Sequence, residues 1–566
     1  MSIKIRTSGI VLLLLATLSL RAISDTTNSK KRWIGLSSAL TVSAQYYHNW
    51  GGAPRQQPFM YSISGAPTLD VKGMSMPFSV IYSNQVFNYH QPFNQLGLAP
   101  RFKFGSIYLG TSSVKFSNYT LAGQRFTGIG ADLQLKWFRL GGMYGRLRRQ
   151  VFPLNNFNDP LTFLNESANE SFLRNGYTAK IGFGTKENFV DLIYFKGYDI
   201  KPNNYNAADW IVKPQENVVF GINSSFKIAQ KLIFKNDWGI SAFTRNQDGD
   251  TIEITEPQLR KLARSILLPN LTTNLRLAGE SSLRWMNKKI SPSISYKRIE
   301  HEYTSLGAYF FQTDLQQISL GLNMNLFKNR LSANFNAGRQ NDNLQKMRLR
   351  TSYRNIGSIN LNFNPSTKWG MSLMYSNFGI TQSPLPKSLT DTTRINQVNH
   401  ALSFSPRLNI QKKSAQHGLQ MVISYNALNN LGASLGASAE NTSYTGSLNY
   451  NFQHVPSSFS AGISPSIIST RTQPGIFEAR GSAVNVGKAL LKGKMVFNYA
   501  LGYFNNTFNG SANGYTLTNL FVVSGNFPKW PTFSLTAQHI QNTSSVATIS
   551  PSFSELFASI TVTYNF

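Results

Sequence analysis

The residue types that most often carry out acid–base or nucleophilic chemistry are few in this sequence, and no catalytic spacing groups them. There is no His-Glu-x-x-His motif, which would present two zinc ligands on one helical turn, and no Gly-x-Ser-x-Gly motif around a nucleophile. His301, between Glu300 and Glu302, is the best candidate for acid–base chemistry, although a solvated loop histidine is the more ordinary interpretation. The seven histidines are His48, His90, His301, His400, His417, His454 and His539. We therefore expect no enzymatic activity, no cofactor and no metal.

The sequence also contains no cysteine. Disulfide bonds, cysteine-ligated metals and a lipid-modified N-terminal cysteine are therefore excluded. A soluble chain of 566 residues would be expected to divide into several domains, but no linker is evident. Charged residues make up only 14% of the chain, and the mean hydropathy is −0.22. This composition suits strands that are polar on one face and apolar on the other, because alternation cancels in an average.

The clearest structural pattern lies at residues 318–338. Apolar side chains alternate with Ser, Gly and Asn, the apolar positions being Ile318, Leu320, Leu322, Met324 and Leu326. Residues 327–330 make a tight connection, and the alternation then returns over residues 331–338, which predicts an antiparallel hairpin. In a soluble sandwich the apolar face would pack on a second sheet. In a membrane barrel it would face lipid, and Ser, Asn and Gly would face a wet interior.

The recurrence of this unit favours the barrel. Alternating segments begin at Ile34 and continue to the C-terminus, which predicts about 24 strands, with bounds of about 22 and 26. Short links, such as residues 184–187 and 287–289, mostly alternate with long ones, such as residues 151–176 and 245–271. We therefore predict an all-β fold over residues 34–566: a single large antiparallel transmembrane β-barrel with short periplasmic turns and long extracellular loops.

Both chain ends agree with export to a bacterial outer membrane. Lys4 and Arg6 precede an apolar run at residues 9–20 and a small-x-small pattern at residues 22–24, which predicts a cleavable signal peptide over residues 1–24 and a short N-terminal segment over residues 25–33. The last strand has an apolar face that includes Ile560, Val562, Tyr564 and Phe566. Its end, Tyr564-x-Phe566, resembles the C-terminal assembly signal of bacterial outer-membrane barrels. We expect Ile560, Val562 and Tyr564 to face the membrane.

One region breaks the alternation of strand direction. Counting strands from the two chain ends gives results that differ by one strand, and the conflict lies between Tyr89 and Phe126. Either a short strand is hidden there, or part of residues 89–125 folds into the lumen and occludes it. The candidate residues for such a plug are Gln91, Pro92, Phe93, Asn94 and Tyr119.

Four segments resemble a family of uncharacterised outer-membrane β-barrel proteins of Bacteroidota, found in lineages with type 9 secretion. They are Gly51-Gly-Ala-Pro-Arg-Gln-Gln-Pro-Phe59, Met76-Pro-Phe-Ser-Val-Ile-Tyr-Ser-Asn-Gln85, Gln91-Pro-Phe-Asn-Gln95 and Tyr303-Thr-Ser-Leu-Gly-Ala-Tyr-Phe310. The resemblance covers most of the chain and implies the barrel fold and the outer-membrane location. It implies no residue-level function.

The charge balance is strongly basic, with 55 Lys and Arg against 25 Asp and Glu. Basic clusters occur at residues 30–32, 146–149 and 288–289, and at Arg348, Arg350 and Arg354. A cationic lumen or rim would attract anions or an acidic partner. The interpretation that we favour is that loop and turn lysines meet anionic lipopolysaccharide headgroups. Nucleic acid is not an expected partner of an exported barrel.

Barrel size restricts the function. Barrels of about 16–18 strands enclose an aqueous channel, and 22-stranded transporters carry a plug. A barrel of about 24 strands therefore needs something to fill it, and this sequence has no N-terminal plug domain. We predict a gated or plugged transport or secretion conduit; the alternative is a non-conducting scaffold that anchors or assembles other envelope proteins. The expected partners are outer-membrane lipid and lipopolysaccharide, the barrel assembly machinery and an envelope protein of unknown identity.

Overall fold

The computed structural model describes residues 34–37, 39–51, 54–71, 74–84, 95–152, 170–252, 266–308, 313–346, 353–382, 395–430, 440–473, 475–528, 530–545 and 552–565. The predicted signal peptide, the segment 25–33, Gln91, Pro92, Phe93, Asn94 and Phe566 lie outside these residues. No described helix is long and apolar enough to cross a membrane.

The described chain is built from 29 strands in one antiparallel sheet. The first fifteen are β1 (Ile34–Ser37), β2 (Ala39–Trp50), β3 (Phe59–Gly65), β4 (Thr68–Val71), β5 (Met74–Ser83), β6 (Gln95–Leu98), β7 (Arg101–Phe102), β8 (Gly105–Ser113), β9 (Arg125–Leu135), β10 (Phe138–Arg148), β11 (Leu173–Gly184), β12 (Phe189–Ile200), β13 (Glu216–Ile228), β14 (Leu232–Thr244) and β15 (Thr273–Trp285). The others are β16 (Ile290–Ile299), β17 (Leu315–Leu326), β18 (Leu331–Asn341), β19 (Tyr353–Phe363), β20 (Trp369–Gln382), β21 (Ile395–Gln411), β22 (Ala415–Asn430), β23 (Asn441–His454), β24 (Phe459–Thr472), β25 (Gly475–Leu490), β26 (Met495–Phe508), β27 (Ser511–Gly525), β28 (Thr532–Asn542) and β29 (Phe553–Asn565).

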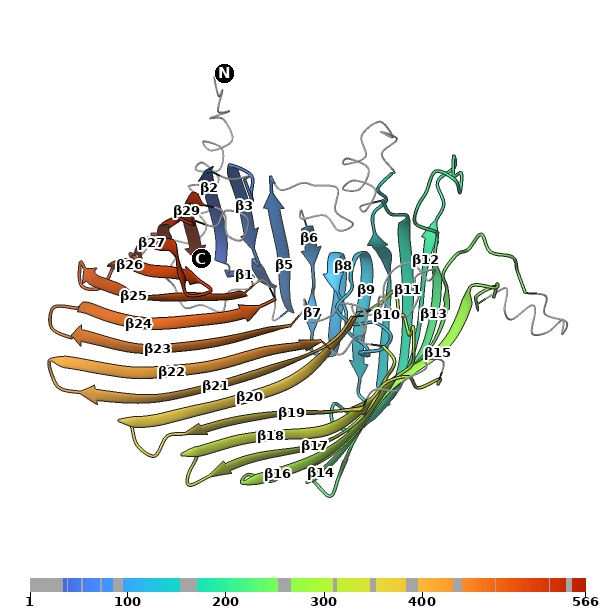
Figure 1. Ribbon diagram of the computed structural model, residues 1–566. Helices are drawn as coiled ribbons and strands as arrows, with labels where there is room; N and C mark the ends of the chain where they lie inside the picture. Colours follow the sequence, from blue (N-terminus) through green and yellow to red (C-terminus); the bar gives the residue numbers. More distant parts are fainter. Residues whose placement is uncertain are drawn as a thin grey trace, which may run out of the picture.

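The sheet closes on itself. Each strand pairs with its neighbours in the sequence, and β2 pairs with β29 from Ala39↔Asn565 to Trp50↔Ser554, so that the first and last strands lie side by side in Figure 1. Three wall strands are interrupted, so that β1 with β2, β3 with β4, and β6 with β7 each cross the wall as one unit. The described residues therefore form a closed barrel of 26 wall strands, which confirms the predicted fold and lies within the predicted bounds.

The hairpin that is clearest in the sequence has the expected register. β17 and β18 pair without a bulge from Leu326↔Leu331 to Gln316↔Asn341. In the turn between them, Phe327, Lys328 and Asn329 adopt φ angles of 52°, 55° and 66°. These left-handed values match the twist of the two strands and hold the connection to four residues, 327–330.

Connection length distinguishes the two ends of the barrel. At one end, which we call the short-turn end, the turns have two to six residues, for example 136–137, 286–289 and 327–330. At the other, the long-loop end, most connections are longer, such as residues 149–172 and 245–272. Two exceptions at the long-loop end are residues 473–474 and 509–510. Asn509 and Gly510 have φ angles of 49° and 80°, which suit a two-residue hairpin turn.

The parity conflict in the sequence arose from a hidden strand. β6 and β7 form a short wall strand interrupted at Ala99-Pro100, and residues 103–104 turn directly into β8. The alternation did not reveal this strand, because proline and glycine interrupt it. We predicted that part of residues 89–125 occludes the lumen. Within the described part of this range, residues 95–98, 101–102 and 105–113 are strands of the wall, and the chain leaves the wall at residues 114–124.

The two faces of the sheet differ in the way that the alternation predicts. Ile318 and Leu320 are 51% and 60% exposed on one face, and Ser319 between them is 5% exposed on the other. Ile560 is 47% exposed, while Leu322, Met324, Leu326, Val562 and Tyr564 are half-buried. All eight lie on the apolar face, which forms the outside of the closed wall; that they contact lipid stays a prediction.

Candidate functional site

One part of the wall is apolar on both faces. In β12, Leu192 is 60% exposed on the outer face, whereas Ile193 and Phe195 on the inner face are buried. The inner faces of β9, β10, β13 and β14 contribute further buried apolar residues, namely Phe126, Met143, Leu147, Val219 and Phe243. Apolar residues on a lumen face require a cover, because water would otherwise contact them.

Two segments provide this cover, and we call them together the inner layer. The first is residues 114–124, between β8 and β9, and the second is residues 300–308, between β16 and β17. Their apolar side chains complete two buried clusters, to which they contribute Val114, Phe116, Tyr119, Leu121, Tyr303 and Leu306. The inner layer therefore gives part of this barrel a small hydrophobic core inside the wall.

The two segments are joined to each other although they are far apart in sequence. The Tyr303 hydroxyl donates to the carbonyl of Tyr119 over 2.6 Å, and the Ser305 hydroxyl donates to the carbonyl of Thr120 over 2.6 Å. The amide of Ala122 donates to the carbonyl of Gly307 over 3.0 Å. Backbone that leaves a sheet must find new hydrogen-bond partners, and these contacts provide them. Burial is the main cause that raises the pKa of both Tyr119 and Tyr303, so both hydroxyls remain protonated donors.

Polar side chains of the wall hold the inner layer in place. Asp237 of β14 accepts hydrogen bonds from the Ser117 hydroxyl at 2.5 Å and from the Asn118 amide at 2.8 Å. Asn223 of β13 donates to the carbonyl of Phe116 over 2.9 Å. Asn217, which is fully buried, accepts from the amide of Leu306 at 3.0 Å. The attachment is therefore specific to these positions.

Glycines in the wall make room for the inner layer. A β-carbon on Gly221 would lie 2.3 Å from Cγ2 of Thr120, and one on Gly239 would lie 2.8 Å from the Tyr303 hydroxyl. A β-carbon on Gly141 would lie 2.8 Å from the Phe116 ring. Contacts under about 3 Å are repulsive, so side chains at these three positions would push the inner layer off the wall.

Two ion pairs accompany the inner layer on the wall. Lys180, which is 5% exposed, pairs with Asp132 and also lies 4.6 Å from the centre of the Phe116 ring. Arg139 binds Asp191 through two hydrogen bonds of 2.6 and 2.9 Å and stacks over Phe189. Each cation also contacts an aromatic ring, which adds to the attraction where water is excluded.

Beyond the inner layer, the lumen face is polar and accessible. A pocket of about 460 Å³ is lined by inner-face residues of β14 to β19, among them Lys235, Arg284, Asn323, Asn334 and Asn360. Further round the wall, Asn451 and Gln453 of β23 are exposed on the same face. Among the described residues, the inner layer thus covers the wall near β9 to β15, and the polar lumen face at β14 to β19 and at β23 is accessible.

The loops above the inner layer form a structured surface at the long-loop end. Phe172 and Trp210 stack at 4.2 Å, and Tyr205 contacts Phe172 edge to face at 5.6 Å. Nearby, Arg174 binds Asp199 through two hydrogen bonds of 2.7 and 2.9 Å, and Arg148 approaches the same carboxylate at 3.7 Å. These contacts join the loop between β10 and β11 to the loop between β12 and β13.

The residues proposed from the sequence lie in different parts of the barrel, and some lie outside the described residues. Tyr119 lies in the inner layer and is 3% exposed, and Tyr564 pairs with Leu40 at the closure of the barrel. Gln91, Pro92, Phe93, Asn94 and Phe566 lie outside the described residues. His301 lies within the inner layer, 3.7 Å from Glu302, and the other described histidines contact different residues. No described group of His, Asp and Glu has the arrangement of a metal site.

Comparisons with known proteins give structural similarity only. No protein-family model and no curated protein matches the chain. Among solved structures, the translocation pore of the P pilus usher PapC has a TM-score of 0.39 at 10% identity, over 94% of this chain and 99% of that one. The FrpB iron transporter of Neisseria meningitidis has a TM-score of 0.35 at 8% identity, over 93% and 82%. OccAB4 of Acinetobacter baumannii has a TM-score of 0.30 at 10% identity, over 67% and 97%. At these TM-scores and identities, no function is transferred.

Proposed function

We propose that the chain is an outer-membrane conduit for transport or secretion, whose own inner layer narrows and gates the lumen. The observation that carries this proposal is the partial cover. A wall of 26 strands encloses more space than wall side chains can fill, and the inner layer covers only the region near β9 to β15. The polar pocket between β14 and β19 lies in the remaining part.

The inner layer has the properties of a gate that belongs to the wall. It is attached through hydrogen bonds at Asp237, Asn223 and Asn217, and not through a covalent crosslink. Each such bond contributes about 1 kcal/mol, and somewhat more where a carboxylate accepts. Burial of Phe116, Leu121 and Leu306 in the apolar cluster also holds the inner layer, so a cargo or partner must replace this apolar cover as well as the hydrogen bonds to displace it.

Electrical conductance across a planar bilayer tests this function. In the test variant, residues 114–124 are replaced by Asn-Gly; since Ser113 pairs with Arg125, a two-residue hairpin turn can close β8 onto β9. In the control variant, residues 543–552 are replaced in the same way, because Asn542 pairs with Phe553. Because the inner layer narrows the lumen, we expect a lower conductance for the intact chain and the control, and a large stable increase for the test variant. Equal conductance of the intact chain and the test variant would contradict gating by the inner layer.

The second candidate is a non-conducting scaffold. The structured surface formed by Phe172, Tyr205 and Trp210 at the long-loop end favours it, because an ordered surface suits the docking of another envelope protein. The same experiment separates the two functions. If both replacement variants insert and remain closed, and a stoichiometric protein copurifies from native membranes, the scaffold is supported and the conduit is not.

A further inference from the structure

Acidic residues are distributed unequally between the two ends of the barrel. At the long-loop end, they pair with basic residues, as in Arg174–Asp199, Lys201–Asp248, Arg245–Glu302 and Arg298–Glu300. Around the short-turn end, the described ion pairs are confined to the early strands, with Lys227–Glu187 as the last along the chain. From residue 228 onward, every short turn except residues 455–458 carries a cation, and none contains an acidic residue.

These cations are exposed and recur in successive turns. We call them the cationic rim; its described members are Lys231, Lys288, Lys289, Lys328, Arg330, Lys368, Lys412, Lys413, Lys492 and Lys494. None of them has an ion-pair partner among the described residues. A ring of uncompensated charge raises the local potential, so that an anionic partner is expected at this end.

Large apolar side chains stand directly beside the rim cations. Phe327, next to Lys328, is 67% exposed; Trp369, next to Lys368, is 58% exposed; and Leu491, next to Lys492, is 60% exposed. On the earlier strands, Trp137 is 68% exposed beside Lys136. Aromatic rings prefer the level of lipid headgroups, and neighbouring lysines extend their ammonium groups to the polar side of that boundary. The repeated pairing of these two residue types indicates a headgroup layer and not an aqueous protein surface.

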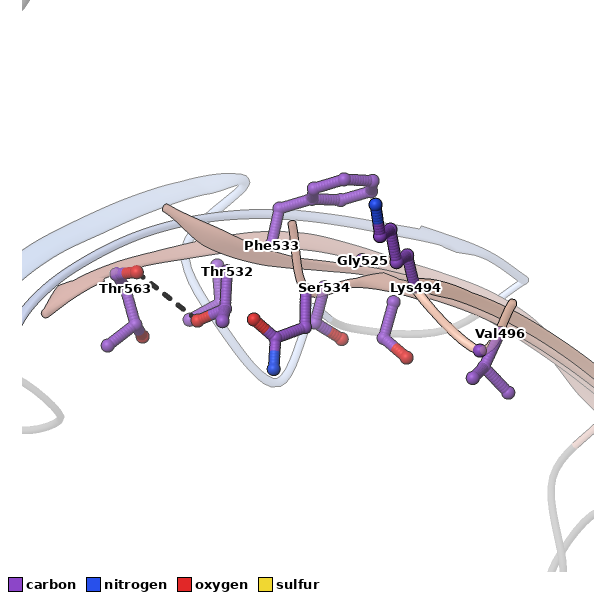
Figure 2. Close-up of a pocket in the computed structure, with 11 residues that line it drawn as sticks. Lys494, Val496, Gly525, Thr532, Phe533, Ser534 and Thr563 are labelled. Carbon is purple, nitrogen blue, oxygen red and sulfur yellow. Dashed lines mark hydrogen bonds between the residues drawn. The ribbon is translucent and has the colours of Figure 1, made fainter. Parts of the chain in front are cut away.

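The rim also contains concave sites. A pocket of about 580 Å³ lies between the turns at residues 229–231 and 286–289, and Arg284, Lys288, Asn287 and Ser291 are among its lining residues. Arg284 and Asn323 line this pocket and also the lumen pocket described above, so it opens to the lumen and not to lipid. A second pocket, of about 280 Å³, lies near the turns at residues 491–494 and 526–531. Thr563 of its lining faces the lumen, but the Lys494 side chain extends to the same side of the wall as the Phe533 ring (Figure 2), which is the outer side because Phe533 pairs with Val562.

We propose that the cationic rim binds the phosphate-bearing headgroups of anionic phospholipids in the leaflet that surrounds the short-turn end. The proposal does not depend on whether the barrel conducts. It also changes the interpretation of the excess charge. The sequence favoured loop and turn lysines that meet lipopolysaccharide, whereas most described ion pairs lie at the long-loop end and the unpaired cations lie in the short turns.

Native mass spectrometry of the purified full chain in a neutral detergent tests the proposal. Short-chain phosphatidylglycerol and phosphatidylcholine, which differ in net charge, are titrated separately and the bound copies are counted. The rim variant is K288Q/K289Q/K328Q/R330Q. The control is K346Q/R471Q, which removes two exposed cations at the long-loop end. Heat-modifiable electrophoretic mobility verifies that each variant is folded.

We expect the intact chain to bind phosphatidylglycerol at least about tenfold more tightly than phosphatidylcholine, since each surface cation contributes about fivefold. The rim variant should lose this preference and the control should keep it. If the rim variant fails to fold, the intact chain should still lose the preference in about 1 M salt, which screens charge beyond about 3 Å. Equal binding of the two lipids by the intact chain, or equal loss in both variants, would overturn the proposal. So would saturation of the rim by soluble glycerol phosphate or polyglutamate at lipid-like concentrations, because the partner would then be a free anion or an acidic protein.

Discussion

At the scale of single residues, neighbours in one strand meet opposite environments. Leu322 lies on the outer face of β17, on the same side as the exposed Leu320, while Asn323 lines the polar pocket of the lumen. A shift of one residue in register would exchange these environments for every residue of the strand. The hairpin pairing of β17 with β18 therefore gives each position a specific tolerance to charge.

We predict that Leu322→Arg destabilises the barrel by about 2–4 kcal/mol, because a guanidinium near the middle of a bilayer loses its hydration. Asn323→Arg should cost much less, since its side chain enters a polar lumen. Urea titration of the two variants in liposomes, followed by tryptophan fluorescence, measures the difference. Equal destabilisation would show that the two residues do not face different environments.

A second residue-scale prediction concerns acid sensitivity of the loop at residues 201–215. Asp248 accepts hydrogen bonds from the Lys201 ammonium and the Tyr205 hydroxyl, and each donor–acceptor distance is 2.5 Å. Burial alone would raise the pKa of Asp248, but these hydrogen bonds, with the charges of Lys201 and Lys213, lower it below the ordinary value of 3.8. Burial and the Asp248 hydrogen bond raise the pKa of Tyr205, so its hydroxyl remains a donor.

Folding lowers the pKa of Asp248. The ionised carboxylate therefore stabilises the loop fully at pH values above the pKa of the unfolded chain, and this stabilisation is lost as the pH falls through the lower pKa of the folded chain. We expect cleavage of residues 201–215 by pepsin to increase steeply below about pH 3–4. In Asp248→Asn, cleavage at the upper end of this pH range should already be faster than in the intact chain, and it should depend less on pH than it does in the intact chain. A variant with the same steep pH response as the intact chain would contradict the assignment to Asp248.

At the scale of elements, alternation predicted the wall strands well because each crosses the wall with one apolar and one polar face. It missed the β6–β7 strand, since β6 has only four residues and Pro100 interrupts the pairing. It also gave no partner for residues 114–124, because their contacts at residues 303–308 are almost 190 positions away. One signal for the inner layer was present in the sequence. Ile193 and Phe195 make β12 apolar on both faces, which an uncovered lumen wall would not tolerate.

The fit between wall and inner layer leads to a prediction for Gly221. In Gly221→Ala, the added carbon would lie 2.3 Å from Cγ2 of the fully buried Thr120. Thr is β-branched and its side chain has little rotational freedom, so the inner layer must move. We expect a loss of about 1–3 kcal/mol and faster proteolysis at residues 114–124. Gly446→Ala is the matched control, because its nearest neighbour, Cγ2 of Ile467, would be 3.5 Å away. Equal effects of the two variants would show that the contact with Thr120 is unimportant.

At the scale of the whole molecule, the features described above depend on closure between the first and last strands. β2 and β29 pair along their whole length, and the Thr41 and Thr563 hydroxyls are 3.1 Å apart on the lumen face. Closure removes the two edges that an open sheet would expose, and in a membrane these edges would be unsatisfied. It also fixes the circumference and thereby the space that the inner layer must fill.

The absence of cysteine makes closure directly testable. In Thr41→Cys/Thr563→Cys, the two thiols should form a disulfide on mild oxidation, because directly paired residues have β-carbons about 4.5–5.5 Å apart, within easy adjustment of disulfide geometry. The product is a covalent ring from residue 41 to residue 563, which should resist heat unfolding and migrate faster than the reduced chain in a denaturing gel. Thr41→Cys/Thr536→Cys is the control, since Thr536 lies in β28, two strands from β2 and about 10 Å or more away. Oxidation should leave the mobility of this control unchanged. If the first pair fails to crosslink in membranes while each single cysteine reacts with a thiol reagent, then β2 and β29 are not neighbours and the barrel is open at this seam.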